Sequence, residues 1–166
     1  MNAPKDIFTE AYHSHADSLF RHALFKVSDR ELAKDLVQET FTKTWAYIAK
    51  SGTVESLKPF LFRTLNNLII DEYRKRKNSS LDELMDEGFD IGVDNSESLF
   101  DTLDGERALA LLRKLPQEYQ DVIYMRYVEG LSPQEISEIL GESKNTLSVR
   151  IHRGLKKLEQ LLEHGK

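Results

Sequence analysis

The sequence of 166 residues contains no cysteine, four prolines and one tryptophan. The lack of cysteine excludes disulfide scaffolds, zinc–cysteine sites, cysteine-ligated iron–sulfur clusters and thiol catalysis. Because small secreted domains often depend on disulfides, it also favours a cytoplasmic location. Long apolar runs are missing too: the longest, Trp45 to Ala49 and Ala108 to Leu112, are too short to span a bilayer. The first ten residues do not resemble a signal peptide, so we expect no membrane insertion.

Charge is distributed unevenly along the chain. Residues 1–77 contain 13 basic and 10 acidic side chains, and residues 107–166 contain 10 basic and 8 acidic ones. Between them, residues 78–106 contain 10 acidic side chains and no basic one. Two mildly basic blocks therefore flank a strongly acidic strip, a distribution that indicates nucleic acid or another charged partner.

Apolar residues recur at helical spacing, and no segment alternates as a strand does, so the predicted fold class is all-α. Three helices are expected first, over residues 6–27, 28–50 and 56–76, and they could form a compact bundle. Ser28 and Glu31 have the spacing of a capping box at the start of the second helix. Pro59 suits the first turn of the third helix, where a missing N–H costs little.

The predicted organisation is two small helical domains, residues 1–77 and 105–166, joined by an acidic flexible linker, residues 78–104. High charge and sparse apolar content favour flexibility in such a linker. In the second domain we expect helices at residues 106–115, 116–127 and 133–140, and a long last helix. Gly154, inside that last helix, is expected to cost about 1 kcal/mol relative to alanine.

Residues 132–158 fit a helix-turn-helix motif. Ser132 and Glu135 form a second capping box, Gly141 follows the short helix, and Ser143 caps the last helix. An apolar stripe is expected to turn the last helix inward at Leu147, Ile151, Leu155, Leu158 and Leu162. Between Ser143 and Leu158 there are five basic residues and no acidic one.

The outer face of that helix is the main candidate for DNA binding. Its expected contact residues are Lys144, Asn145, Thr146, Ser148, Val149, Arg150, His152, Arg153 and Lys156. Donors and short side chains such as Ser148 and Arg153 suit base edges in a major groove. Arg150 and Lys156 are better placed for phosphates, which position a protein without specifying a sequence. The alternative is a solvated basic face.

The end of the third helix is a second candidate, since it combines four basic residues with an aromatic ring. Its expected contact residues are Arg63, Asn66, Asn67, Tyr73, Arg74, Lys75, Arg76 and Lys77. A basic groove with an aromatic neighbour suits single-stranded or melting DNA, on which bases can stack. The alternative is that positive charge here complements the helix dipole, which explains one or two of these residues more readily than four.

A polar stripe on the second helix is the third candidate. Asp35, Gln38, Glu39 and Thr42 lie at spacings of three and four residues, so they share one face. Spacing alone favours ordinary solvated surface for these residues.

Taken together, these segments resemble bacterial sigma factors of the extracytoplasmic-function (ECF) type, in the sigma-70 family. Residues 35–41, Asp-Leu-Val-Gln-Glu-Thr-Phe, look like the most recognisable motif of that family. Residues 60–74 resemble its promoter-melting helix, and residues 115–158 resemble its C-terminal helix-turn-helix. The segments occur in the family's order across nearly the whole chain, with a linker in the right place.

The resemblance implies a subunit that gives core RNA polymerase its promoter specificity and is not itself an enzyme. It implies that Asp35, Gln38, Glu39 and Phe41 bind the clamp helices of the β′ subunit. It also implies that the first domain captures the minus-ten element as a single strand, with a flipped base held by residues 49–57. The second domain would bind minus-thirty-five duplex and the β flap. The linker would thread polymerase channels, and a separate anti-sigma factor would hold the protein inactive.

Two other hypotheses remain open. A plain helix-turn-helix regulator that binds duplex DNA as a dimer explains residues 132–158 but leaves the first 77 residues unexplained. An enzyme or metal protein would need a constellation that the sequence does not offer: His13 and Asp17 could pair, but no third ligand joins them. We therefore expect no catalytic residue, no metal and no cofactor.

Overall fold

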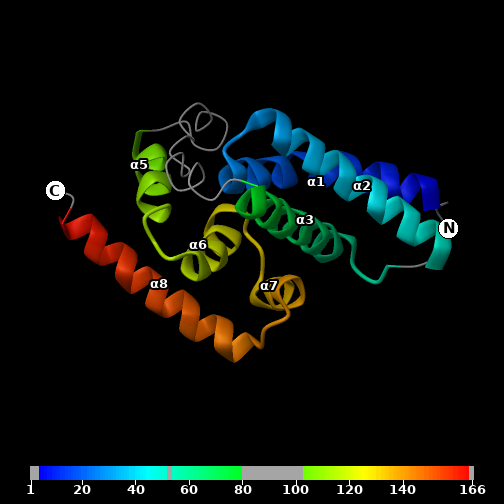
Figure 1. Cartoon of the computed structure of the whole chain (residues 1–166). Helices are drawn as coiled ribbons and strands as arrows, with labels where there is room; N and C mark the ends of the chain where they lie inside the picture. The colour runs from blue at the N-terminus through cyan, green and yellow to red at the C-terminus, as the bar shows by residue number, and fades with distance from the viewer. Residues whose placement is uncertain (1–3, 52–53, 80–102, 165–166) are drawn as a thin grey trace. The chain divides into compact units, whose positions relative to one another are not determined.

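The computed structural model describes residues 4–51, 54–79 and 103–164 of the chain. It separates into two compact units, residues 1–95 and 96–166, each described here by itself. The described residues form helices joined by short turns, without a strand among them, as the predicted all-α class requires (Figure 1). Most of the predicted linker, residues 80–102, lies outside the described residues, so its flexibility stays a prediction.

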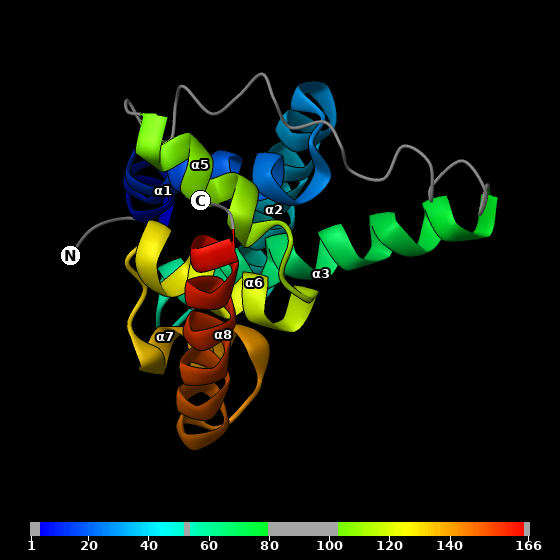
Figure 2. The ribbon, with the colours of Figure 1, turned by 90° about the vertical axis from the view of Figure 1, so that its left-hand side faces the viewer.

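The first unit is a three-helix bundle of α1 (Pro4–Val27), α2 (Arg30–Ser51) and α3 (Leu57–Ser79), in which each helix packs against the other two. The fully buried side chains of its core include Leu19, Ala23, Ala33, Leu61, Phe62 and Leu65. Pro59 lies in the first turn of α3, as predicted. α3 continues three residues beyond the predicted end, and in Figure 2 its last turns extend past α1 and α2.

The junction between α1 and α2 differs from the predicted capping box. The Asp29 carboxylate, not the Ser28 hydroxyl, accepts a hydrogen bond from the backbone N–H of Leu32, at 3.1 Å. Ser28 instead adopts a left-handed conformation with φ of 55°, and its N–H donates to the Leu24 carbonyl at 2.9 Å. The capping-box prediction was therefore wrong by one residue, because Ser28 ends α1 rather than beginning α2.

The second unit contains α5 (Leu103–Leu112), α6 (Gln117–Ile123), the π-helix η2 (Tyr124–Val128), α7 (Pro133–Leu140) and α8 (Lys144–His164). The sequence predicted one continuous α-helix from Pro116 to Tyr127. In the structure the helix widens after Ile123, and the Glu129 N–H donates to the Tyr124 carbonyl five residues earlier, at 3.1 Å. Apolar spacing alone does not distinguish such a wide turn from an α-helix.

The helix-turn-helix formed by α7 and α8 confirms the predicted capping. The Ser132 hydroxyl accepts from the Glu135 N–H at 3.1 Å, and the Glu135 carboxylate accepts from the Ser132 N–H at 2.9 Å. Gly141 is left-handed, with φ of 72°, a conformation that glycine adopts at little cost. The Ser143 hydroxyl caps α8 by accepting from the Thr146 N–H at 3.1 Å.

The inward face of α8 differs from the predicted stripe. Leu147 is buried as expected, but Leu155 is 36% exposed and Leu162 is 47% exposed. Gly154 is buried instead, against α6. The stripe that faces inward is Leu147, Ile151, Gly154, Leu158 and Leu161. The prediction was correct for Leu147, Ile151 and Leu158 and wrong for Leu155 and Leu162, because a glycine, which has no side chain to signal burial, occupies the central contact position.

None of the described helices combines the length and the apolar character needed to cross a membrane. Within the same residues, no group of three or more histidine, aspartate or glutamate side chains lies close enough together to hold a metal ion.

Candidate nucleic-acid and protein interfaces

The outer face of α8 is open to solvent. Its exposed candidates are Lys144, Asn145, Thr146, Ser148, Val149, His152, Arg153 and Lys156. Val149 is 43% exposed, although it is apolar. The structure therefore brings nearly all of the predicted contact residues onto one helix, with the buried Leu147 on the opposite side.

Arg150 is the exception on α8, because it is half-buried and paired. Its guanidinium lies 3.3 Å from the carboxylate of Glu142 in the turn. The Ser137 hydroxyl donates to the Glu142 backbone carbonyl at 2.6 Å. The turn between α7 and α8 is thus held from both helices, and Arg150 has a structural contact in addition to any contact with phosphate.

The basic end of α3 exposes most of its candidates. Arg63, Asn67, Arg74, Lys75 and Lys77 are exposed. Arg76 is half-buried and lies 3.7 Å from the carboxylate of Glu72, one turn earlier.

Two candidates on α3 face the interior instead. The Tyr73 hydroxyl donates a hydrogen bond to the backbone carbonyl of Lys26, near the end of α1. That carbonyl is one of the last in its helix, where intrahelical donors run out. Asn66 is 9% exposed, and its side chain lies near the buried side chain of His22. The prediction that the Asn66 side chain faces DNA was wrong, because Asn66 lies on the core side of α3.

His22 is an unexpected polar residue in the core of the first unit. It is fully buried, with its ring against Phe62 at a centroid distance of 5.7 Å. Burial, and secondarily the charge of Lys26, lower the pKa of His22 to about 3, while the polar side chain of Asn66 acts in the opposite direction. His22 is therefore neutral at neutral pH.

The polar stripe on α2 is exposed as the spacing predicted. The side chains of Asp35, Gln38, Glu39 and Thr42 all face solvent, and the Thr42 hydroxyl donates to the Gln38 backbone carbonyl at 3.0 Å. Phe41 is different, because only 4% of it is exposed. It contributes to the surface only as part of the groove between α1 and α2.

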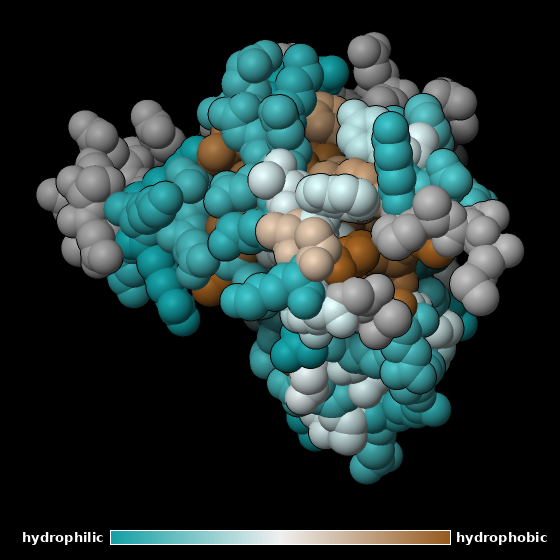
Figure 3. Space-filling view, turned by 90° about the vertical axis from the view of Figure 1, so that its right-hand side faces the viewer, coloured by the Kyte–Doolittle hydropathy of each residue, from teal (hydrophilic) through white to brown (hydrophobic). Residues whose placement is uncertain are grey.

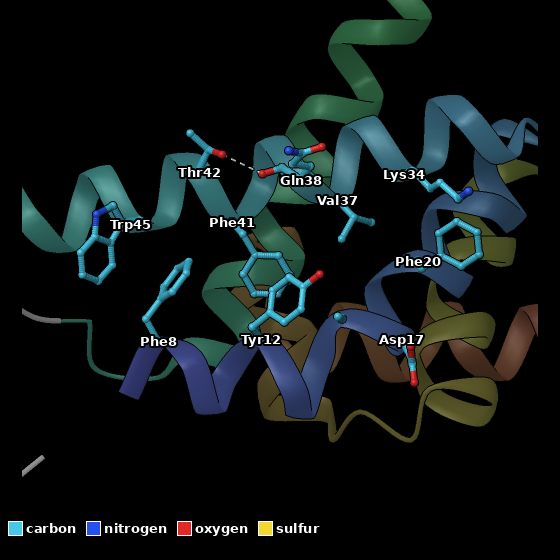
Figure 4. A pocket seen from close by; sticks show the side chains of 11 residues that line it. Phe8, Tyr12, Asp17, Phe20, Lys34, Val37, Gln38, Phe41, Thr42 and Trp45 are labelled. Atoms are coloured by element: carbon cyan, nitrogen blue, oxygen red, sulfur yellow. Dashed lines mark hydrogen bonds between the residues drawn. The ribbon is translucent and has the colours of Figure 1, made fainter. Parts of the chain in front are cut away.

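That groove, of about 720 Å³, is the feature that the sequence did not predict (Figure 4). It is lined by Phe8, Tyr12, Ala16, Asp17, Phe20, Lys34, Val37, Gln38, Phe41, Thr42 and Trp45. Rings from the two helices meet across it, with centroids 5.1 Å apart for Phe8 and Trp45 and 4.8 Å apart for Tyr12 and Phe41. The rings that meet form one pair on each helix with a spacing of four residues, Phe8 and Tyr12 on α1 and Phe41 and Trp45 on α2, and this spacing could have indicated a shared aromatic face.

The groove and the polar stripe are continuous. Gln38 and Thr42 belong to both, because they line the groove and are also exposed on the stripe. Phe8 and Trp45 lie at one end of the groove, and Lys34, Phe20 and Asp17 lie at the other (Figure 4). Tyr12 is 49% exposed and Trp45 is 40% exposed, which leaves large apolar surface beside the carboxylates of α2.

Comparison with known proteins identifies the family. Models of sigma-70 region 2 and sigma-70 region 4 match residues 11–79 and 105–158, respectively. The RNA polymerase sigma factor SigV of Bacillus subtilis is 30% identical over 142 residues, which cover 86% of this chain and 82% of SigV. The chain is an ECF sigma factor of the sigma-70 family. The region 2 match contains the stripe of α2 and the exposed residues of α3, and the region 4 match contains the helix-turn-helix.

Other relatives agree with this assignment. The ECF RNA polymerase sigma factor SigE of Mycolicibacterium smegmatis is 31% identical over 158 residues, which cover 92% of this sigma factor and 60% of SigE. Among solved structures, RpoE of Bartonella quintana in complex with the anti-sigma factor NepR has a TM-score of 0.75 and 26% identity, covering 94% of this chain and 96% of RpoE. CnrH, solved with the cytosolic domain of CnrY, shares the fold, with a TM-score of 0.72 and 23% identity over 99% of this chain and 92% of CnrH.

Proposed function

We propose that this sigma factor binds core RNA polymerase and directs initiation at promoters with two elements, in the cytoplasm. In this proposal α8 binds the minus-thirty-five duplex, and α3 captures the minus-ten element as a single strand. The observation that carries the proposal is the exposed outer face of α8, built on a capped helix-turn-helix, in a chain that also matches sigma-70 region 2.

Docking on the polymerase is assigned to α2. Asp35, Gln38 and Glu39 are exposed polar groups suited to a basic or polar helix of the β′ clamp. The adjoining groove adds apolar surface that a side chain of the partner can bury. Such buried anchors, often aromatic, usually dominate the binding energy of protein interfaces. We infer that an apolar side chain of the polymerase enters the groove over Phe41, beside Trp45.

Duplex binding is assigned to the exposed face of α8. Ser148, Val149, His152 and Arg153 are proposed to contact base edges, and Lys144, Arg150 and Lys156 to contact phosphates. Asn145 and Thr146, in the first turn, are proposed to contact DNA near the helix N-terminus, where backbone N–H groups favour phosphate.

Strand capture is assigned to Arg63, Asn67 and the basic residues at the end of α3. Tyr73 is proposed to position this end through its hydrogen bond to Lys26, rather than to stack on a base. An anti-sigma factor remains a proposed partner, and it is supported by the anti-sigma complex of RpoE. Contact of the second unit with the β flap remains a proposal without assigned residues.

Reconstituted transcription tests the proposed function. The pure protein is added to core bacterial RNA polymerase with fragmented genomic DNA, and the 5′ ends of the RNA products are mapped. We expect discrete new start sites that share two upstream sequence elements. The absence of new starts, together with tight and salt-sensitive binding of the protein alone to duplex DNA, would favour a plain helix-turn-helix regulator instead.

A further inference from the structure

A pair of aromatic rings joins the end of α2 to the beginning of α3. The ring centroids of Tyr47 and Phe60 lie 4.9 Å apart, with the planes tilted by 43°. Phe60 is half-buried, but Tyr47 remains 46% exposed. Its neighbour Trp45 lies on the other flank of α2, in the groove with α1. Figure 3 shows apolar surface among hydrophilic side chains on the face of the molecule where α2 ends.

Cationic side chains share the helix faces on which the two rings lie. Lys43 and Lys50 lie four residues before and three residues after Tyr47, so all three share one face of α2. Arg63 and Asn67 follow Phe60 at spacings of three and seven residues on α3. The side chains of all four are exposed.

Acidic side chains near this surface are few. Glu39 lies two turns before Tyr47 on α2, Glu55 lies in the short segment before α3, and Asp71 lies one turn after Asn67 on α3. An exposed ring with cations on both sides has the composition of a surface that binds single-stranded nucleic acid, where bases stack on aromatic rings and cations contact the phosphates.

We propose that the exposed face of Tyr47 stacks on one unpaired base of the promoter strand, with Phe60 supporting the ring from beneath. Lys43 and Lys50 contact the phosphates on either side of that base. The strand then continues along α3 past Arg63 and Asn67. This inference rests on the proposed function, to which it adds a base-binding residue on α2 that neither the charge pattern nor the family motif indicates.

The same geometry has a purely structural explanation, in which the two rings only brace α2 against α3. The two explanations differ in what they require of residue 47. A brace requires apolar volume, which leucine supplies. Stacking requires a flat π face, which phenylalanine supplies and leucine does not.

The experiment uses wild-type and variant holoenzyme on a promoter obtained by the 5′-end mapping described above. The promoter segment around the minus-ten element, upstream of the mapped start site, is left unpaired, and 2-aminopurine replaces single bases of each unpaired strand one at a time. For the wild type, we expect fluorescence quenching at one position, where the base stacks on Tyr47. Tyr47→Ala and Tyr47→Leu should abolish that quenching and weaken binding of holoenzyme to the partly unpaired promoter about tenfold. Tyr47→Phe should preserve both the quenching and the affinity.

Tyr127→Ala is the matched control, because Tyr127 is also an exposed tyrosine, at 58%, but lies in the second unit. It should leave quenching and affinity unchanged. Three results would overturn the inference: wild-type quenching in Tyr47→Ala, restored quenching and affinity in Tyr47→Leu, or a loss in Tyr47→Phe equal to that in Tyr47→Ala. The second result would identify a brace, and the third a contact through the hydroxyl.

Failure of this inference is distinguishable from failure of the proposed function. If the wild-type protein gives no promoter-specific transcripts with core polymerase, the proposed function fails first. If the wild type initiates at specific promoters and the Tyr47 variants do not differ from it in quenching or affinity, the proposed function is supported and the stacking site is contradicted.

Discussion

Gly154 of α8 lies directly against Ile123 of α6. A β-carbon at Gly154 would lie 2.6 Å from the Cδ1 of Ile123 and 3.2 Å from the Cβ of Tyr119. The first distance is too short for two non-bonded carbon atoms, so the end of the Ile123 side chain would have to move. The close approach of α6 and α8 therefore depends on a residue that disfavours the helix in which it lies.

Gly154→Ala should destabilise the second unit despite its better helix propensity. Overpacking costs about 1–3 kcal/mol in well-packed cores, and alanine returns about 1 kcal/mol of propensity. We expect a net loss of up to about 2 kcal/mol in the free energy of unfolding, measured by urea denaturation. Gln160→Ala, at an exposed position of the same helix, should change it by less than about 0.5 kcal/mol.

The Ile123→Val substitution checks the cause of that loss. Valine lacks the Cδ1 atom that meets the new β-carbon, so the double variant Gly154→Ala with Ile123→Val should be more stable than the two single losses predict. Purely additive losses would show that the contact between these two residues is not responsible.

The turn between α1 and α2 gives opposite predictions for adjacent residues. Ser28→Gly should stabilise the first unit by about 0.5–1 kcal/mol, because the left-handed conformation of Ser28 suits glycine. Asp29→Ala should cost about 1 kcal/mol, because it removes the cap on the Leu32 N–H. Thermal unfolding followed by circular dichroism measures both. If Ser28→Gly instead destabilised the first unit, the result would support Ser28, rather than Asp29, as the residue that caps α2.

Local signals predicted most of the helices and their ends. The Ser132–Glu135 capping box and Gly141 depend on interactions within a few residues, so the sequence alone was sufficient. Ser28 had the same serine and glutamate spacing and misled, because Asp29 beside it is an equally good cap. Two competing local signals cannot be ranked without the conformation of the chain that precedes them.

The incorrect and missing predictions share a tertiary cause. Gly154 faces inward because α6 approaches it, and Asn66 faces inward because His22 lies opposite it on α1. Neither partner is near in sequence. The groove beside Phe41 likewise depends on the alignment of α1 with α2. The exposed polar stripe and the outer face of α8 were predictable because helical periodicity alone separates outer from inner residues.

His22 should make the stability of the first unit sensitive to acid. Its pKa is lowered from 6.5 to about 3 by burial and by Lys26, so below pH 6.5 the unfolded chain binds a proton that the folded chain does not. The stability that depends on neutral His22 is fully present above pH 6.5 and is lost as the pH falls toward 3. At about pH 5 the loss should be about 2 kcal/mol, measured by urea denaturation across the pH range.

His22→Leu separates this titration from that of the carboxylates. The variant should be less stable than wild type at neutral pH, because leucine does not reproduce the shape of the buried ring that packs against Phe62. Its stability should nevertheless fall less steeply between about pH 6.5 and pH 4. Parallel pH profiles for the two proteins would contradict the low pKa of His22.

The surface of α2 predicts how variants affect polymerase binding. Asp35→Lys should weaken binding to core polymerase by about tenfold or more, because a reversed charge at an interface repels the partner. Glu118→Lys reverses an acid that is also exposed but lies in the second unit, and it should have little effect. Trp45→Ala should weaken binding by a similar factor if the groove is occupied. If Trp45→Ala bound core polymerase with wild-type affinity and had a wild-type thermal unfolding midpoint, the polar stripe of α2 would remain as the proposed contact and the groove would not.

The outer face of α8 predicts two distinguishable classes of variant. Lys156→Ala should weaken binding to all upstream elements alike and reduce the salt dependence of binding by about one counterion, because a phosphate contact carries no sequence information. Arg153→Ala should instead relax the preference at one base pair, at a cost of about 1–3 kcal/mol for the best sequence. Competition binding of holoenzyme to a library of upstream elements, repeated at several salt concentrations, measures both effects. If Arg153→Ala instead reduced the affinity equally for every sequence, Arg153 would be assigned to the phosphates. Arg150→Ala should lower the stability of the turn as well as the affinity for DNA, because Arg150 pairs with Glu142.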